Sequence, residues 1–309
     1  MTALILHIGT EKTGSTSIQD FLFNSSESLS QLGFYYPTSL GIKNHRLLHA
    51  IVADPDYVSG PFKYYKDIDD NKKSLLCSEW ISAFESEFYQ HQNKTWIISS
   101  EQLHSRLRSP QSVRRLSEFL SRYFDSIKLV VYLRKPLSCA ISMLSTALKT
   151  GNTRLTLPHL DNPYWCNLVD HRATLIRWSE YFPSITVRIF SRQNLYYADA
   201  VRDFLFALNI PLSDHAHSVV KLSNVNQSLS LLGMKFLSCF NTYFGFTYRT
   251  RFLPFVLLRR LSLLVAVLLS KCFPQSYVPT PQDIEEYSAL EANDEYILSV
   301  WRKDLQVLW

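Results

Sequence analysis

A lysine, a glycine and four hydroxyl side chains occupy six consecutive positions just after the first apolar run of the chain. Glycine lets the backbone amides of a tight turn point at one anion, and a nearby lysine adds a full positive charge. The apolar run over residues 3–8 has the length of a strand, and Ile18, Phe21 and Leu22 follow at helical spacing. This order predicts a strand–loop–helix cradle for a phosphate or sulfate group. The cradle consists of Lys12, Thr13, Gly14, Ser15, Thr16 and Ser17.

The position of the lysine separates this loop from the loops that bind nucleoside triphosphates. Those loops read GxxxxGK[ST], with the lysine directly after the second glycine. Here Ser15 follows Gly14, and Lys12 comes two residues before that glycine. The spacing therefore argues against a kinase or an ATPase. For this loop taken alone, the alternative is a tight turn that carries a solvated lysine.

A second apolar run, over residues 127–133, ends in a cation. It is rich in aliphatic and β-branched side chains, as expected of a parallel strand buried on both faces. Arg134 follows directly, where a magnesium-dependent NTPase would carry an aspartate. A helix expected over 137–149 places Ser142 near its start. Arg134 and Ser142 would then offer a guanidinium and a hydroxyl to one phosphate. The alternative, for Arg134 considered alone, is an ordinary surface arginine.

Together the two motifs resemble those of sulfotransferases that use 3′-phosphoadenosine 5′-phosphosulfate. The 5′-phosphosulfate loop of that family, Lys-[Ser/Thr]-Gly-[Ser/Thr]-Thr, is matched by residues 12–16. Its 3′-phosphate motif, Arg-x-Pro followed by a serine eight residues after the arginine, is matched by Arg134, Pro136 and Ser142. Residues 185–195 and 226–229 look similar to the bacterial carbohydrate-type members. The resemblance covers about residues 3–210, and the C-terminal Arg-Lys-Gly segment of cytosolic members is absent from this sequence.

The resemblance implies a P-loop-like fold, the sulfated nucleotide as co-substrate and no metal. Loop amides, Lys12 and Arg134 would neutralise the donor. A base for the acceptor hydroxyl is expected at Glu101, which follows a strand predicted over 95–99, at the sheet edge where α/β proteins bind ligands. Carbohydrate members of the family often carry a glutamate near this position. The alternative for Glu101 is a helix-capping role.

Three further residues are candidates for substrate contact. His45 and His49 are four residues apart and would share one face of a helix. A zinc site is not indicated, because no glutamate lies between them as in HExxH and no third ligand is evident. Acceptor binding is the functional interpretation, and ordinary, partly exposed histidines are the alternative. Lys149, at the end of the helix that carries Ser142, would contact the donor or an anionic acceptor.

Strands and helices alternate through the first two thirds of the chain, which predicts an α/β fold with a parallel sheet flanked by helices on both faces. Beyond Pro211 the pattern is helical, over 226–243, 253–272 and 281–303. No linker, repeat or low-complexity tract divides the 309 residues. We therefore expect one domain over 1–309, with an α/β core over 1–212 and a helical C-terminal extension over 213–309.

Composition limits the partners. Aromatic content of 14% and charged content of 19% fit a sizeable core, and the net charge of +5 suits an anionic nucleotide and a polyanionic glycan. No basic stripe interleaved with aromatic residues indicates nucleic acid. Five scattered cysteines without a CxxC pair predict reduced, buried thiols in a cytosolic protein. Residues 1–2 lead straight into the first strand without a signal peptide, so the active site is expected to face the cytoplasm.

The segment from Phe252 to Phe273 is rich in leucine and valine, yet Arg259 and Arg260 lie near its middle. Inserting two central arginines into a membrane has an unfavourable free energy of about 5 to 7 kcal/mol, and the apolar side chains contribute a favourable one of roughly 4 to 8 kcal/mol. A membrane-spanning helix is therefore not favoured. Ser270 and Lys271 follow the arginines by three helical turns and extend one polar edge. The segment predicts contact with an anionic membrane surface on the cytoplasmic side, near lipid-linked glycans, with a buried helix or a dimer contact as the alternative.

The residues thus favour an enzyme that moves a sulfuryl group from 3′-phosphoadenosine 5′-phosphosulfate to a hydroxyl of a carbohydrate or glycolipid. Residues 13–17 would bind the 5′-phosphosulfate. Lys12 would stabilise the negative charge on the leaving oxygen. Arg134 and Ser142 would hold the 3′-phosphate, and Glu101 would deprotonate the acceptor. Two alternatives stay open: a non-catalytic membrane- or partner-binding protein on this scaffold, and a P-loop small-molecule kinase.

Overall fold

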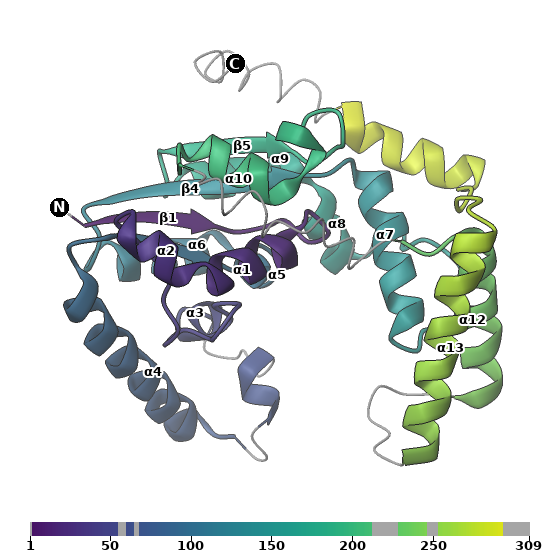
Figure 1. The fold of residues 1–309 in the computed structure, drawn as a ribbon, viewed down its shortest axis with the longest axis horizontal. Helices are drawn as coiled ribbons and strands as arrows, with labels where there is room; N and C mark the ends of the chain where they lie inside the picture. The colour runs from purple at the N-terminus through teal and green to yellow at the C-terminus, as the bar shows by residue number, and fades with distance from the viewer. Residues whose placement is uncertain (1, 55–59, 65–67, 212–227, 246–252, 293–309) are drawn as a thin grey trace. The chain divides into compact units, whose positions relative to one another are not determined.

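The computed structural model describes residues 2–54, 60–64, 68–211, 228–245 and 253–292 (Figure 1). Its residues form two compact units, each of which draws on separate stretches of the chain. Among the described residues, the first unit combines those between 2 and 134 with 170–211. The second combines 135–169 with those between 228 and 292.

A five-stranded parallel sheet forms the centre of the first unit (Figure 1). Its strands lie in the order β2-β3-β1-β4-β5 and each pairs in parallel with its neighbours. Their bounds are β1 Ala3–His7, β2 Phe34–Tyr35, β3 Thr95–Ser99, β4 Ser126–Leu133 and β5 Ile185–Ile189. Because all strands run the same way, the loops after β1, β3 and β4 meet at one edge of the sheet. The predicted fold class is confirmed.

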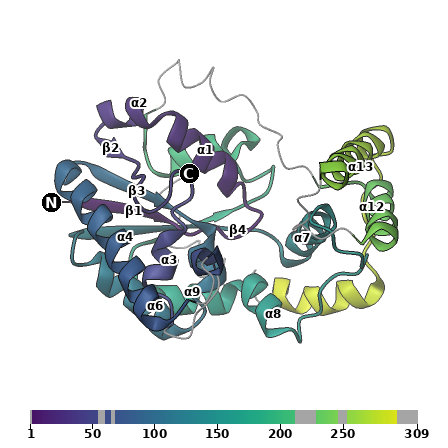
Figure 2. The same cartoon turned by 90° about the horizontal axis from the view of Figure 1, so that it is seen from below.

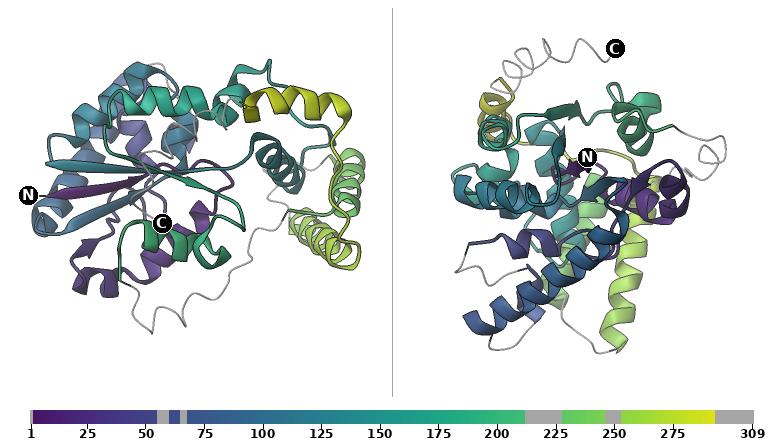
Figure 3. Two further views of the ribbon diagram at one scale, coloured as in Figure 1. Left: turned by 90° about the horizontal axis from the view of Figure 1, so that it is seen from above. Right: turned by 90° about the vertical axis from the view of Figure 1, so that its left-hand side faces the viewer.

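Alternating side chains of the strands enter two separate cores. Leu4 and Leu6 of β1 and Trp96 of β3 belong to one core, whereas Ile5 and Ile97 belong to the other. Successive residues of a strand point to opposite faces, so apolar residues at every position require cover on both sides. Figure 2 shows α1 and α2 on one side of the sheet and α3, α4, α6 and α9 on the other, and Figure 3 shows the sheet from the opposite direction.

The helices of the first unit fill these two layers. Ile18 and Leu22 of α1 pack with Phe204 of α10 in one core, and Phe84 of α4 packs with Trp178 of α9 in the other. Their bounds are α1 Ser15–Asn24, α2 Ser26–Gln31, α3 Leu47–Ile51, η1 Gly60–Tyr64, α4 Asp70–His91, α5 Glu101–Arg106, α6 Pro110–Leu120, α9 His171–Ser179, η2 Tyr196–Ala198 and α10 Ala200–Ala207.

The second unit is helical and has its own apolar core. Ala140 and Leu144 of α7 pack there with Met234 of α12, Ala266 of α13 and Tyr287. The bounds are α7 Pro136–Lys149, α8 Pro163–Val169, α12 Leu231–Phe244 and α13 Leu253–Cys272, followed by a helix over 281–292. The unit therefore contains the described parts of the predicted C-terminal helices, and residues 226–227 and 293–303 of those predictions lie outside the described residues. It also contains 135–169, which the sequence pattern assigns to the α/β core over 1–212.

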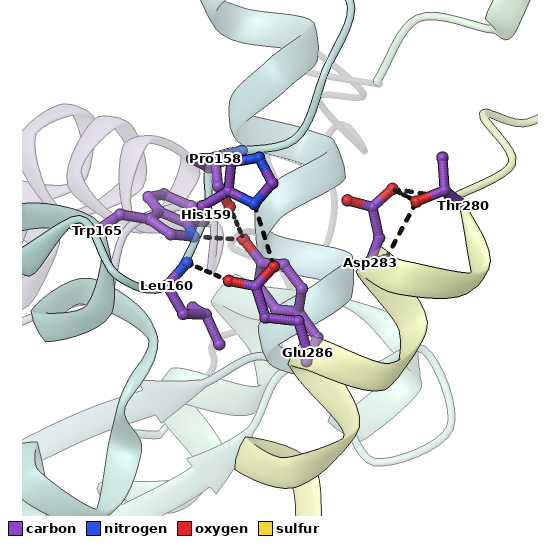
Figure 4. Close-up of polar contacts among 8 residues, drawn as sticks. Pro158, His159, Leu160, Trp165, Thr280, Asp283 and Glu286 are labelled. Carbon is purple, nitrogen blue, oxygen red and sulfur yellow. Dashed lines mark hydrogen bonds and ion pairs between the residues drawn. The ribbon is translucent and has the colours of Figure 1, made fainter.

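The helix over 281–292 is fixed at both its start and its side (Figure 4). At its start, the Thr280 N–H and hydroxyl donate to Asp283 Oδ2 at 2.8 and 2.7 Å, and the Asp283 N–H donates back to the hydroxyl at 3.1 Å. Along its side, the Tyr287 hydroxyl donates to the Pro158 carbonyl at 2.7 Å and accepts from the Trp165 indole. Glu286 accepts from the Leu160 N–H. The sequence favours a helix start here, because Thr280 directly precedes Pro281, and the cap is confirmed.

Two expectations need correction. The sequence pattern near residues 164–182 favours a single helix, but the structure has two, α8 and α9, because Asp170 accepts from the Ala173 N–H at 2.8 Å and starts α9 anew. Of the five cysteines, Cys139 is buried, but Cys239 and Cys272 are exposed. Within the described residues, none of the five forms a disulfide. Among the helices that the structure describes, none combines the length and the apolar character needed to cross a membrane.

Candidate active site

The loop between β1 and α1 has an unusual backbone. Gly9, Lys12 and Gly14 all have positive φ, at 93°, 64° and 80°. For Lys12 such a conformation costs about 1 to 2 kcal/mol, because its Cβ approaches the following carbonyl oxygen. At Gly9 an added Cβ would lie 3.0 Å from the Glu101 Cβ, so glycine allows the start of α5 to approach the loop. Strain of this kind persists where the surroundings hold the chain in place, and it is concentrated at functional sites.

Neighbouring strand β4 holds the loop. The Thr10 N–H donates to the Tyr132 carbonyl at 2.9 Å, and the Tyr132 N–H donates to the Gly9 carbonyl at 2.6 Å. One step further along, the Arg134 Nη1 donates to the Lys12 carbonyl at 3.0 Å. The ladder between β1 and β4 thus continues into the loop, and this accounts for its fixed shape.

The predicted hydroxyls divide into two groups. Thr13 is fully buried and donates to the Thr10 carbonyl at 2.5 Å, and Ser15 donates to the same oxygen at 3.5 Å. These two side chains stabilise the turn. Thr16 is exposed and Ser17 is half-buried at the first turn of α1. The N-cap is Gly14, which has no side-chain oxygen to occupy the N–H groups of Ser15 and Thr16, so these two groups can donate to an anion.

Substituting Gly14 with alanine tests how closely the loop is packed. The new Cβ would meet the Ala200 Cβ at 2.8 Å and the Phe190 ring at 3.1 Å. Gly33 provides the matched control, because its φ of 86° is similar but nothing lies within 4 Å of an added Cβ. Both variants carry the cost of a left-handed alanine. We expect Gly14→Ala to lower the free energy of unfolding by roughly 1 kcal/mol more than Gly33→Ala in urea titrations. Equal losses would contradict the packing described here.

Arg134 lies against the loop. Besides its bond to the Lys12 carbonyl, its guanidinium lies 5.7 Å from the centre of the Phe190 ring. The Arg134 carbonyl contacts the His171 Nε2 at 2.7 Å. Ser142 is buried in α7 of the second unit. Its cooperation with Arg134 would extend across the two units and stays a prediction.

The Glu101 carboxylate is held by two neutral amides. Gln19 of α1 donates to Oε2 at 2.9 Å and Asn44 donates to Oε1 at 2.9 Å. The Asn44 side chain is oriented in turn by the Ser100 hydroxyl, which donates to its Oδ1 at 2.8 Å. Glu101 is the first residue of α5, whose N-cap is Ser100, and its carboxylate accepts from side chains of α1 and of the loop before α3. The capping alternative does not describe this geometry.

Glu11 is a neighbour of the site that the sequence analysis did not identify. Burial and the negative charge of Glu101 raise the pKa of the Glu11 carboxyl, against the opposing effects of the Ser105 hydroxyl and the Lys12 charge. A raised pKa means that Glu11 holds a proton more firmly than an exposed glutamate does. The available signal was its position directly before the lysine of the anion loop.

The histidine pair lies differently from the prediction. α3 begins at Leu47, so His45 precedes the helix and does not share a helix face with His49. Both rings are buried. The His45 Nδ1 accepts from the Ser99 N–H at 2.8 Å, and its Nε2 contacts the Pro37 carbonyl at 2.8 Å. His45 therefore ties the loop before α3 to the end of β3, and acceptor binding by the pair stays a prediction.

The buried His45 ring predicts a dependence of stability on pH. Burial lowers its pKa to about 4, so the unfolded chain takes up the proton first as the pH falls. The contribution of the neutral His45 ring to the free energy of unfolding is fully present above about pH 6.5 and is lost as the pH falls toward 4. From pH 7 to 5 it should decrease by about 2 kcal/mol. Urea titrations should show a weaker pH dependence for His45→Gln than for the unmodified protein, and identical dependence would contradict this role.

Lys149 is the last residue of α7 in the second unit. Its carbonyl accepts from the Arg259 Nη2 of α13 at 2.9 Å. Contact of its side chain with donor or acceptor stays a prediction. Within the described ranges, no group of three or more histidine, cysteine, aspartate or glutamate side chains could hold a metal ion.

Comparison with known proteins gives structural neighbours only. No family model and no curated protein sequence matches the chain. A sulfotransferase from Alicyclobacillus acidocaldarius aligns with a TM-score of 0.42 and 17% identity, over 70% of this chain and 88% of its own. A sulfotransferase domain from the curacin biosynthetic pathway aligns with a TM-score of 0.39 and 12% identity, over 70% and 77%.

A chain of the PezAT toxin–antitoxin system of Streptococcus pneumoniae also aligns, with a TM-score of 0.32 and 13% identity, over 73% of this chain and 86% of its own. The structural neighbours therefore carry more than one description. The function proposed below rests on the residues of the site.

Proposed function

We propose that this protein is a sulfotransferase that takes a sulfuryl group from 3′-phosphoadenosine 5′-phosphosulfate and transfers it to a hydroxyl of a carbohydrate or glycolipid. The observation that carries the proposal is the contact of Arg134 with the Lys12 carbonyl at 3.0 Å. It joins the two predicted anion motifs, which are 122 residues apart in sequence, at one edge of the sheet. A nucleotide with phosphate groups at both ends of its ribose suits such a pair.

The first motif would bind the sulfated end of the donor. Amides at the start of α1 would donate to the 5′-phosphate, together with the exposed Thr16 hydroxyl and the Ser17 hydroxyl. Because the Thr13 side chain stabilises the turn, Thr13 would contribute its backbone amide. The second motif, Arg134 with Ser142, would bind the 3′-phosphate. In loops that bind nucleoside triphosphates, the lysine follows the second glycine, whereas Lys12 precedes Gly14 here. This difference fits a donor that needs no metal bridge between phosphates.

Transfer would proceed by displacement at sulfur. The acceptor hydroxyl oxygen attacks the sulfur atom, and its proton passes to the Glu101 carboxylate. The bond between sulfur and the bridging phosphate oxygen breaks, and the electron pair stays on that oxygen. The Lys12 ammonium stabilises this developing negative charge. The amides of Gln19 and Asn44 would keep the Glu101 carboxylate in position for the acceptor proton.

The direct test is a donor-consumption assay. The full chain is incubated with the sulfated nucleotide and a panel of oligosaccharides, glycolipids and simple alcohols, with a chelator present throughout. We expect release of 3′-phosphoadenosine 5′-phosphate with at least one sugar acceptor, unaffected by the chelator. A parallel assay replaces the sulfated nucleotide with ATP and magnesium. Turnover of ATP that stops when the chelator is added would instead identify a magnesium-dependent kinase.

Substituting Arg134 with alanine should weaken binding of the nucleotide product. A hydrogen bond to a charged group contributes about 1.5 to 3 kcal/mol, so the Kd should rise roughly tenfold to a hundredfold. Calorimetry measures the change, and Arg114→Ala on the exposed side of α6 is the matched control. If Arg134→Ala bound the nucleotide as tightly as this control, the arginine would have no part in a phosphate site.

A further inference from the structure

Positive charge is concentrated in one stretch of the sequence. Residues 215–282 contain no aspartate or glutamate. The remaining chain has 25 basic and 27 acidic residues, a balance of −2, so this stretch supplies the whole positive net charge of +5. The stretch includes both α12 and α13. Its seven cationic residues are Lys221, Lys235, Arg249, Arg251, Arg259, Arg260 and Lys271.

One face of α13 exposes a row of leucines. Leu257, Leu261, Leu264 and Leu268 are 55%, 57%, 66% and 60% exposed. Their spacing of four, three and four residues places them on a single side of the helix. Large aliphatic side chains are rarely left this exposed in a continuous row unless they meet a partner or a lipid surface. We call this row the leucine face.

The opposite side of α13 is fixed against the rest of the unit. Ala266 is buried, and an added Cβ at Gly233 of α12 would lie 2.7 Å from the Ala266 carbonyl. The Ser270 hydroxyl donates to that carbonyl at 2.7 Å and accepts from the Ser230 N–H at 3.0 Å. Figure 1 shows α12 and α13 side by side. These contacts hold α13 in an orientation that leaves the leucine face on the outside.

Two cations border the leucine face. Arg260 and Lys271 are exposed, and their separation of 11 residues, three helical turns, places them along one edge of the leucine row. Arg259, one residue before, lies on the other side and donates to the Lys149 carbonyl at 2.9 Å. The helix therefore presents an apolar row with a basic border and carries no acidic side chain. This is the pattern of helices that lie in the interface of an anionic membrane.

We propose that the leucine face docks on an anionic lipid surface, with the leucines among the acyl chains and Arg260 and Lys271 at the phosphate level. Charge complementarity decides between this occupant and a second copy of the chain. A symmetric pair would bring the cations of both copies together without an acidic partner from α12 or α13. The docking does not depend on the proposed enzyme activity.

Vesicle co-sedimentation of the full chain tests the docking. Vesicles of phosphatidylcholine alone are compared with vesicles that also contain phosphatidylglycerol, at low and high salt. We expect binding to the anionic vesicles that falls as salt increases. The double variant Arg260→Gln, Lys271→Gln should bind about 25-fold more weakly, at about fivefold for each charge. Arg114→Gln with Lys72→Gln removes two exposed charges of the first unit and should have little effect.

A second variant tests the apolar contribution. Leu261→Ser with Leu264→Ser changes only exposed side chains, so the helix content measured by circular dichroism should be unchanged while vesicle binding falls. Equal binding to neutral and anionic vesicles, or no binding to either, would overturn the proposal. It would also be overturned by a dimer in sedimentation analysis that the leucine variant converts to a monomer.

Discussion

Substituting Lys12 with alanine should lower kcat by about a hundredfold to a thousandfold, while the affinity for the nucleotide changes much less. The ammonium is proposed to act on negative charge that appears only as the bond between sulfur and phosphate oxygen breaks. Removing one such donor typically costs about 2.7 to 4 kcal/mol in the transition state. Single-turnover measurements with saturating donor separate this loss from a binding defect.

The chain offers two controls for this variant. Lys72→Ala removes an exposed lysine of α4 and should leave kcat unchanged. Lys12→Arg keeps the positive charge at the same backbone position, and we expect it to recover part of the rate. If Lys12→Ala kept the turnover of the unmodified protein, charge stabilisation by this residue would be excluded.

Substituting Glu101 with glutamine should lower kcat by roughly a hundredfold to ten thousandfold, which is the range lost with a general base. The change keeps the size of the side chain and removes the group that accepts the acceptor proton. The nucleotide Kd should be nearly unchanged, because Glu101 is not assigned to the donor. Glu27→Gln, at an exposed position of α2, is the matched control.

The amides around Glu101 allow a finer distinction. Gln19→Leu removes the 2.9 Å hydrogen bond to Glu101, together with the weaker bonds of the same amide to Ser99, and leaves the carboxylate itself in place. As a positioning residue, Gln19 should reduce kcat less than Glu101→Gln does. A full rate for Glu101→Gln would transfer the role of the base to another group.

The sheet, and the edge of it where the anion loop and Arg134 lie, could be predicted from the sequence because both depend on local patterns. The runs at 3–8 and 127–133 have apolar residues on both faces, which only a buried parallel strand requires. Loops after such strands lie at one edge whatever the order of the strands. That is why the approach of Arg134 to the loop at residue 12 was foreseeable, whereas the strand order and the short strand β2 were not.

What the sequence missed depends on packing between distant segments. From the sequence, α7 has the pattern of the next helix in an α/β repeat. In the structure, its Ser145 hydroxyl accepts from the Leu229 N–H at 2.9 Å, and this bond joins α7 to the C-terminal helices. The raised pKa of Glu11 follows from burial and from Glu101, 90 residues away in sequence. The histidine pair suggested a helix face by its spacing, but Asn44 and His45 belong to the loop that orients Glu101 and β3.

Calorimetric titration of the full chain with 3′-phosphoadenosine 5′-phosphate, in a buffer that contains a chelator, tests most directly whether two anion sites bind one nucleotide. We expect saturable binding of one molecule per chain, weakened by Arg134→Ala and also by substitutions at residues 16 and 17. Absence of binding to the unmodified protein, or binding that requires a divalent metal, would contradict the assignment of the two motifs to this nucleotide.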